Sequence, residues 1–373
     1  MTIYHACLGF AYFYGTKAPG LNDRKSVHVT NIDRFTSVQP RELSRCKNAH
    51  NQSERSVYFS AHIWRWFLLI FLSFFGRGIC VSPAYPGDHP WLTGPLFTPS
   101  GEVIGFGHFD IEPYFFLTTR TGRYDKNWHA VSIRKFHQLN AQVTIKAGIH
   151  ERITFSCLPQ YFHNETQKVS TSGFGDLPIG FDIQLLEEKD GRPPVKLIIQ
   201  ETIPIGRYHK LKAVNKGTDA IGLGSFSTQV GLASCKLFHF KDDHYLSTSA
   251  NFFVVYFAPV HVRGINVYGG DDSTNGTVYP GTSFNFYCSA EYTLTENWVL
   301  ALDVLSYFSL KGHFKGFSEK AVSSPSTAQI SLAPAIEYNW SKTVGVIAGP
   351  WFTVGGKNST CFYSAVAAVN FYF

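Results

Sequence analysis

Long segments in which apolar and polar residues alternate one by one are the feature that most constrains this chain. In residues 138–149 every odd position from Leu139 to Ile149 is apolar, and the even positions carry Gln, Asn, Thr, Lys or Gly. Residues 283–294 and 327–340 repeat the pattern. Because successive side chains of a β-strand point to opposite faces, this alternation predicts strands with one apolar and one polar face.

These segments are too long for an ordinary soluble sheet. Globular strands average about five or six residues, whereas a tilted strand that crosses a membrane needs roughly 9–11. Most alternating segments of this chain are longer than an average globular strand and long enough for a tilted strand to cross a membrane. Twelve are expected, at 106–119, 138–149, 152–163, 175–187, 194–203, 222–237, 244–258, 282–294, 297–311, 327–340, 343–354 and 361–373.

The connections between these segments alternate in length. Short polar turns are expected near residues 150–152, 188–193, 241–243, 295–297 and 341–342, and longer links rich in Gly, Asn and Ser at 120–137, 164–174, 204–221, 259–281, 312–326 and 355–360. Outer-membrane barrels of Gram-negative bacteria have short periplasmic turns and long extracellular loops, and closure leaves no unpaired strand edge in lipid. We therefore predict an all-β fold, a transmembrane antiparallel up-and-down β-barrel of about 12 strands over residues 102–373.

The segment before the barrel has the layout of an export signal. Residues 64–75 form an apolar run with Arg65 near its start and Gly76-Arg77-Gly78 after it, and the run is too short for a transmembrane helix. The predicted signal peptide covers residues 57–81. Residues 1–56 are expected to be a poorly structured extension, which would be explained by a translation start later than Met1. Residues 82–101 are expected to be a periplasmic segment.

The net charge of +6 belongs to this leader and argues against a nucleic-acid partner. Residues 1–80 hold 10 Lys and Arg against 4 Asp and Glu, while the remainder is balanced. Proteins that bind nucleic acid need a basic surface to neutralise phosphates. The expected partner of the body is instead the lipid bilayer of the outer membrane.

Two features near strand ends agree with this location. Trp298 and Trp340 lie beside short turns on the apolar parity, where an interfacial aromatic belt is expected. The chain finishes as an aromatic-alternating strand at Phe373, which resembles the signal that the barrel-assembly machinery recognises.

If the apolar parity faces lipid, the opposite parity lines the lumen. We predict that its charged residues set the selectivity of a passage: Asp110, Glu112, Lys146, Asp182, Lys196, Glu291, Asp303 and Glu337. Carboxylates outnumber lysines in this set, which favours cations or neutral polar solutes. The alternative is that these charges pair across the lumen and plug it.

Catalytic, metal and cofactor sites are not expected. His108, Asp110 and Glu112 lie on one strand face in steps of about 7 Å, and such a row does not surround one ion without ligands from other strands. None of the 15 His is followed two residues later by Ser, the pattern of outer-membrane phospholipases. The four body cysteines (Cys157, Cys235, Cys288 and Cys361) show no C-x-x-C spacing and are expected to pack as small apolar residues.

Short glycine-based motifs resemble one family. They are Gly173-Phe-Gly175-Asp176-Leu-Pro-Ile-Gly180, Pro204-Ile-Gly206, Gly217-Thr-Asp219 and Gly222-Leu-Gly224-Ser225, with Ile205 where the resemblance would place Thr. Over about residues 100–373 the chain resembles the outer-membrane barrel family named for the MetA pathway of phenol degradation. The resemblance implies a porin-like transporter of aromatic or other small hydrophobic compounds.

Two functions follow as hypotheses. The first is a non-enzymatic outer-membrane channel or transporter for small molecules. The second is a structural or adhesive surface protein with a closed lumen, whose long loops, such as Gly269–Gly276, carry the function. Sequence alone does not decide between them, because it does not show which lumen charges pair.

Overall fold

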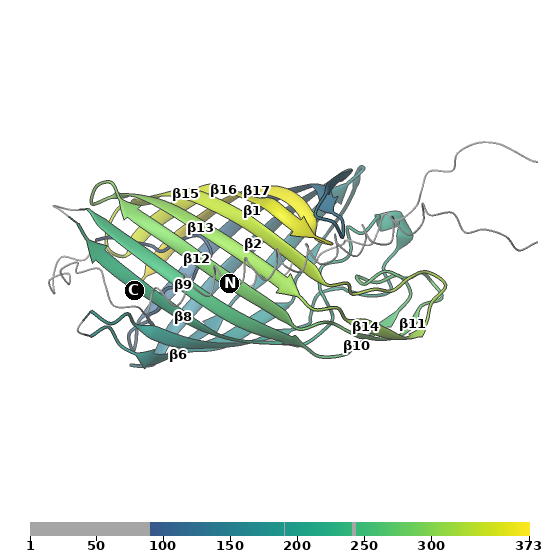
Figure 1. Ribbon diagram of the computed structural model, residues 1–373, viewed down its shortest axis with the longest axis horizontal. Coiled ribbons are helices and arrows are strands. Elements are labelled where there is room, and N and C mark those ends of the chain that lie inside the picture. The colour runs from purple at the N-terminus through teal and green to yellow at the C-terminus, as the bar shows by residue number, and fades with distance from the viewer. Residues whose placement is uncertain (1–89, 190, 241–243) are drawn as a thin grey trace, which may run out of the picture. The chain divides into compact units, whose positions relative to one another are not determined.

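The barrel predicted from the alternation is present in the structure. The computed structural model describes residues 90–373 except 190 and 241–243, and in them the chain forms a closed antiparallel barrel (Figure 1). Strands far apart in the sequence close it, because β1 pairs with both β2 and the last strand, β17. The expected extension 1–56 and the signal peptide 57–81 lie outside the described residues.

The strands are numbered along the chain. They are β1 (Phe109–Tyr124), β2 (Ala130–His150), β3 (Ile153–Cys157), β4 (Gln160–Thr166), β5 (Val169–Phe174), β6 (Leu177–Leu186), β7 (Val195–Ile203), β8 (Ser227–His239), β9 (Tyr245–Phe257), β10 (Val260–Arg263), β11 (Asn275–Tyr279), β12 (Ser283–Thr293), β13 (Trp298–Ser309), β14 (His313–Phe317), β15 (Thr327–Asn339), β16 (Val344–Lys357) and β17 (Thr360–Tyr372). One short 3-10 helix, η1 (Ala213–Asn215), lies in the loop after β7. No helix of the described residues is long and apolar enough to cross a membrane.

The barrel has the twelve strands that the sequence predicts. β3 and β4 form one barrel strand interrupted at Leu158 and Pro159, and β5 and β6 form the next, since β3 pairs with β6 and β4 with β5. Backbone bonds bridge the interruption, from Leu158 N to Pro178 O at 2.9 Å and from Val143 N to Pro159 O at 3.0 Å. Pro159 has no N–H to donate to a β-ladder, which explains why the strand is interrupted at this position.

The turns are sorted by length between the two ends of the barrel, as predicted. Three of the expected long links are shorter than predicted, however. The strands extend far into the expected links 120–137, 164–174 and 355–360. β1 ends at Tyr124 and β2 begins at Ala130, and β4 and β5 are separated only by residues 167–168. Only residues 358–359 separate β16 from β17. The sequence pattern did not predict these extensions, because they carry polar residues on both faces. A β-ladder that lies beyond the membrane does not need an apolar face.

The remaining long loops carry structure of their own. β10, β11 and β14 form a separate three-stranded sheet that extends from one end of the barrel (Figure 1). The loop 204–226, which contains η1, runs beside it, with Lys210 N donating to Arg263 O at 3.0 Å. These elements lie at the long-loop end, which is extracellular in barrels of this kind.

The two faces of the barrel wall have the polarity that the alternation predicts. On β15 every residue of the parity that contains Gln329, Ser331 and Glu337 is buried, while Ile336, on the other parity, is exposed. Trp298 and Trp340 are exposed at the short-turn end, and Tyr338 lies between them with ring centroids at 4.7 and 5.4 Å. This outward apolar surface is suited to lipid.

Candidate functional site

The eight charged residues expected to line the lumen all lie on barrel strands. Asp110 and Glu112 are on β1, Lys146 on β2, Asp182 on β6, Lys196 on β7, Glu291 on β12, Asp303 on β13 and Glu337 on β15. Six of them are buried, and the other two, Glu112 and Lys146, are half-buried. The structure sorts them into three groups with different partners.

The first group is an ion cluster where β1, β2 and β17 meet. Lys146 Nζ lies 2.7 Å from Asp110 Oδ2 and 3.3 Å from Glu112 Oε1. Asn370 Nδ2 donates to Asp110 Oδ1 at 2.6 Å and to Glu112 Oε1 at 3.2 Å, and the hydroxyl of Tyr114 donates to Glu112 at 3.3 Å. One lysine therefore serves two carboxylates, and the cluster keeps a net negative charge.

The second group is a nearly buried ion pair on the neighbouring strands β6 and β7. Lys196 Nζ lies 2.8 Å from Asp182 Oδ2 and also donates to the backbone oxygen of Glu102 at 2.9 Å. Glu102 precedes β1, so this hydrogen bond joins a barrel strand to the segment that comes before the barrel in the sequence.

The third group consists of carboxylates without a cation. Glu291, Asp303 and Glu337 come from three consecutive barrel strands, and none joins an ion pair among the residues that the structure describes. Asp303 Oδ1 accepts hydrogen bonds from Thr98 N at 3.0 Å and from Thr98 Oγ1 at 2.6 Å. Glu337 accepts from Asn339 Nδ2 at 2.6 Å and from the backbone N–H of Thr93.

These contacts place residues 91–104 within the barrel. The segment first meets the short-turn end, where Asn339 Nδ2 donates to Trp91 O at 2.9 Å. It reaches Asp303 near mid-strand, and it returns to the short-turn end, where Ile104 N donates to Thr154 Oγ1 at 2.8 Å. Residues 90–101 belong to the segment that the sequence assigns to the periplasm, and in the structure their hydrogen bonds are to side chains of the lumen.

The deepest part of this segment is apolar. Leu96 and Phe97 are buried, and the Phe97 ring lies 4.8 Å from Trp351 and 6.1 Å from Phe116, measured between centroids. Trp351 also contacts Phe362 at 4.5 Å, and its Nε1 donates to Ser331 Oγ at 3.0 Å. The lumen is thus crossed at mid-height by an aromatic cluster, which the polar parity alone does not predict.

Small inward residues make room for this cluster. Ala233, Ala301, Ala333, Ala335 and Ala368 are buried in the same hydrophobic cluster as Leu96 and Phe97. A larger side chain at these positions would compete with the inserted segment for the same space. The sequence holds one signal for the insertion: Leu96 and Phe97 form an apolar pair outside the alternating pattern, between Pro95 and Pro99.

The glycine-based motifs converge at the long-loop end. Gly206 N donates to Asp176 Oδ1 at 2.9 Å, and Leu223 N donates to Asp176 Oδ2 at 2.7 Å. A Cβ on Gly222 would lie 2.7 Å from Gly206 Cα, which leaves no room for any side chain. The motif residues therefore fix the start and end of the loop 204–226 to one carboxylate at the mouth of the barrel, a structural role.

Two further features concern potential metal ligands and cysteines in the part of the chain that is described. No group of three or more His, Cys, Asp or Glu there has the arrangement to hold a metal ion. The four cysteines in that part are free and half-buried, which fits small packing residues.

The closed barrel, its outward apolar face and its lumen define an outer-membrane β-barrel protein, located in the outer membrane. The family described as "Putative MetA-pathway of phenol degradation" matches residues 141–360, more than half of the chain. The chain belongs to this family, as the motifs indicate. A search of curated protein sequences finds no significant match.

The first of three similar solved structures supports the fold, and the other two align with lower scores. The COG4313 outer membrane channel from Pseudomonas putida F1 aligns with a TM-score of 0.57 and 12% identity, covering 78% of this chain and 100% of that one. The Pseudomonas putida toluene transporter TodX aligns with a TM-score of 0.35 and 11% identity over 70% and 88% of the two chains. The translocator domain of the autotransporter NalP from Neisseria meningitidis gives 0.37 and 10% over 72% and 90%.

Proposed function

We propose that this chain is a non-enzymatic outer-membrane channel for small molecules, with aromatic or other apolar compounds as its main solutes. The observation that carries the proposal is the aromatic cluster around Phe97 and Trp351 in the middle of the lumen. An apolar solute gains free energy there by leaving water, at about 25 cal/mol per Å² of apolar surface buried. The description of the family, which refers to phenol degradation, supports the same solute class.

The eight lumen charges have a second role in this proposal. Six carboxylates face two lysines, so the lumen potential is negative and passing ions are selected in favour of cations. Glu291, which pairs with no lysine of the described residues, and Glu112, which shares Lys146 with Asp110, both contribute to this potential. Charged groups at mid-strand are stable only when they are paired, hydrogen-bonded or hydrated, and Asp303 and Glu337 accept hydrogen bonds from Thr98 and Thr93.

Export and assembly complete the proposal. Residues 57–81 serve as the signal peptide, and the barrel-assembly machinery recognises the last strand through Phe373. That side chain is exposed on the outward parity at the end of the chain, as such recognition requires.

Uptake by intact cells tests the solute class. Apolar compounds cross phospholipid liposomes unaided, so cells with and without the protein are compared for accumulation of radiolabelled toluene and of a disaccharide. We expect faster toluene uptake in cells that carry the protein, and no change for the disaccharide. Equal toluene uptake in both strains would favour the surface-protein function with a closed lumen.

Reversal potentials in planar bilayers test the ion preference. Under a salt gradient the wild-type protein should prefer cations, and Glu112→Gln combined with Glu291→Gln should reduce that preference severalfold by removing two negative charges. Glu187→Gln combined with Glu296→Gln, on exposed residues at the short turns, makes the same change in charge outside the lumen. An equal loss in both pairs would mean that the lumen carboxylates do not set selectivity.

A further inference from the structure

The extracellular sheet β10–β11–β14 has one apolar face and one basic face. On the apolar face Val260, Val262 and Val278 are buried and pack against Tyr208 and Tyr268. The hydroxyl of Tyr268 donates to the backbone oxygen of Leu223 at 3.0 Å. The Leu223 side chain packs against Val255 and Phe257, which belong to the buried, lumen-facing parity of β9. The apolar face is therefore turned toward the loops at the barrel mouth.

The opposite face consequently lies on the outer circumference of the molecule. His261 and Arg263 on β10 and Lys315 on β14 are exposed there, and the strand register places His261 beside Thr277 and Thr277 beside Lys315. Arg263 Nε donates to His261 Nε2 at 3.2 Å, which leaves the outer nitrogens of the guanidinium available. Lys315 Nζ lies 5.2 Å from the centre of the Tyr279 ring.

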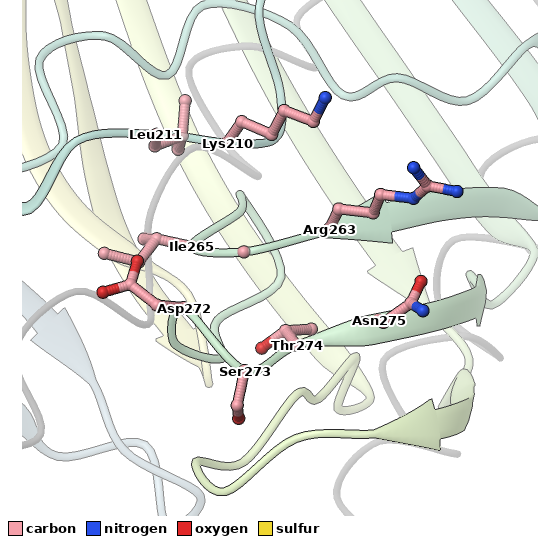
Figure 2. Close-up of a pocket in the computed structure, with 9 residues that line it drawn as sticks. Lys210, Leu211, Arg263, Ile265, Asp272, Ser273, Thr274 and Asn275 are labelled. Atoms are coloured by element: carbon pink, nitrogen blue, oxygen red, sulfur yellow. The ribbon is translucent and has the colours of Figure 1, made fainter.

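A pocket beside Arg263 adds a further cation. Its volume is about 650 Å³, and it is lined by Lys210, Leu211, Arg263, Gly264, Ile265 and residues 272–275. Figure 2 shows the Lys210 and Arg263 side chains extending in the same direction, with the carboxylate of Asp272 on the other side of the pocket. Lys210, His261, Arg263 and Lys315 together are called the basic face here.

The surroundings of the basic face carry an excess of positive charge. The pKa of His209 is lowered below its usual value by burial, and Lys210, His261 and Arg263 lower it further. The three long loops, 204–226, 258–282 and 310–326, together hold eight Lys and Arg against four Asp and Glu. This end of the molecule is thus positive, whereas the lumen is negative.

The basic face begins where the lipid-facing surface ends. Tyr256 is 59% exposed on the outward parity of β9, five residues before His261, and Leu310 is 44% exposed, five residues before Lys315. Five residues of extended chain span about 17 Å. The cations therefore lie within about 17 Å of residues that face lipid, in reach of the polar head groups that border the hydrocarbon layer.

We propose that the basic face binds the phosphorylated head group of an anionic glycolipid in the outer leaflet. Arg263 presents two parallel N–H groups that match phosphate oxygens, and Lys210 and Lys315 add point charges on either side. The hydroxyl and amide groups of Ser273 and Asn275 at the pocket suit the hydroxyl groups of a sugar. The lipid thereby holds the extracellular sheet against the membrane surface, a role separate from passage through the lumen.

Lipid titration of the purified full chain tests the proposal. In an uncharged detergent, binding of lipid A, a bis-phosphorylated glycolipid, is measured beside dephosphorylated lipid A and inorganic phosphate. We expect saturable binding of lipid A only. Arg263→Gln with Lys315→Gln should weaken it at least about tenfold, and salt should weaken it too, because exposed charges are screened.

The control pair makes the same change in charge at the opposite end of the barrel. Lys189→Gln with Lys342→Gln alters two exposed lysines near short turns and should leave lipid A affinity unchanged. Heat modifiability on gels establishes that every variant is folded. Equal binding of dephosphorylated lipid A, an affinity for lipid A that Arg263→Gln with Lys315→Gln does not change, or displacement of lipid A by inorganic phosphate at equal concentration would overturn the proposal.

Discussion

At the scale of single residues, Asp176 shows how one carboxylate can organise a loop. Its two oxygens accept from the backbone of Gly206 and Leu223, at opposite ends of the loop 204–226. The glycines of the motif are required because the two backbones approach each other closely, which is the ordinary reason for glycine at a contact of this kind.

A methyl group at Gly222 should therefore disturb this loop. Its Cβ would lie 2.5 Å from Asp176 Oδ1 and 2.7 Å from Gly206 Cα, so Gly222→Ala should destabilise the loop by roughly 1–3 kcal/mol. Trypsin cleavage after Lys210 and Lys212 should become severalfold faster. Gly355→Ala is the control, because its Cβ would meet nothing nearer than Trp128 at 3.8 Å. Cleavage at the wild-type rate would show that the close approach is not what fixes the loop.

At the scale of elements, the segment 90–106 has no regular secondary structure and yet determines what the lumen contains. Its polar contacts include Asp303, Glu337 and Lys196, and its apolar contacts surround Phe97. Burying Leu96 and Phe97 contributes about 1.5–3 kcal/mol for each side chain, and together with the hydrogen bonds this favours the inserted position of the segment.

Loss of these two apolar side chains should open the passage. Leu96→Ser with Phe97→Ser removes the burial term and leaves two hydroxyls that find no partner in an aromatic cluster. Single-channel conductance should rise severalfold over the wild type. Phe106→Ser, on a side chain that is 67% exposed in the same segment, should leave conductance unchanged. A conductance equal to that of the wild type in the double variant would show that the segment does not limit the passage.

At the scale of the whole molecule, the two ends of the barrel differ in length of loop, in structure and in charge. The long-loop end carries the three-stranded sheet and the positive loops, and the short-turn end carries the Trp298 and Trp340 surface. The first barrel strand begins at the short-turn end and the last strand ends there. Both termini of the barrel are therefore on the periplasmic side.

Cysteine labelling of intact cells checks this orientation. Asn275→Cys on the extracellular sheet should react with a membrane-impermeant maleimide, whereas Glu296→Cys at a short turn should react only after lysis. Both positions are exposed, so accessibility of the side chain does not distinguish them. The wild-type chain gives the background from its own cysteines. Reaction at Glu296→Cys in intact cells, with none at Asn275→Cys, would invert the topology.

The sequence by itself determined the barrel, its twelve strands, the sorting of its turns and the side of the wall on which each charge lies. It could do so because side-chain direction in a strand has a fixed period of two and because lipid demands an apolar outer face. Only the tertiary structure decided which charges meet. Lys146 reaches Asp110 and Glu112, while no cation of the described residues pairs with Glu291, since pairing depends on strand register and on distances across the lumen. The insertion of residues 91–104 and the convergence of Asp176, Gly206 and Gly222 were likewise decided there. An irregular segment has no sequence period that indicates its position, and its partners lie up to 248 residues away.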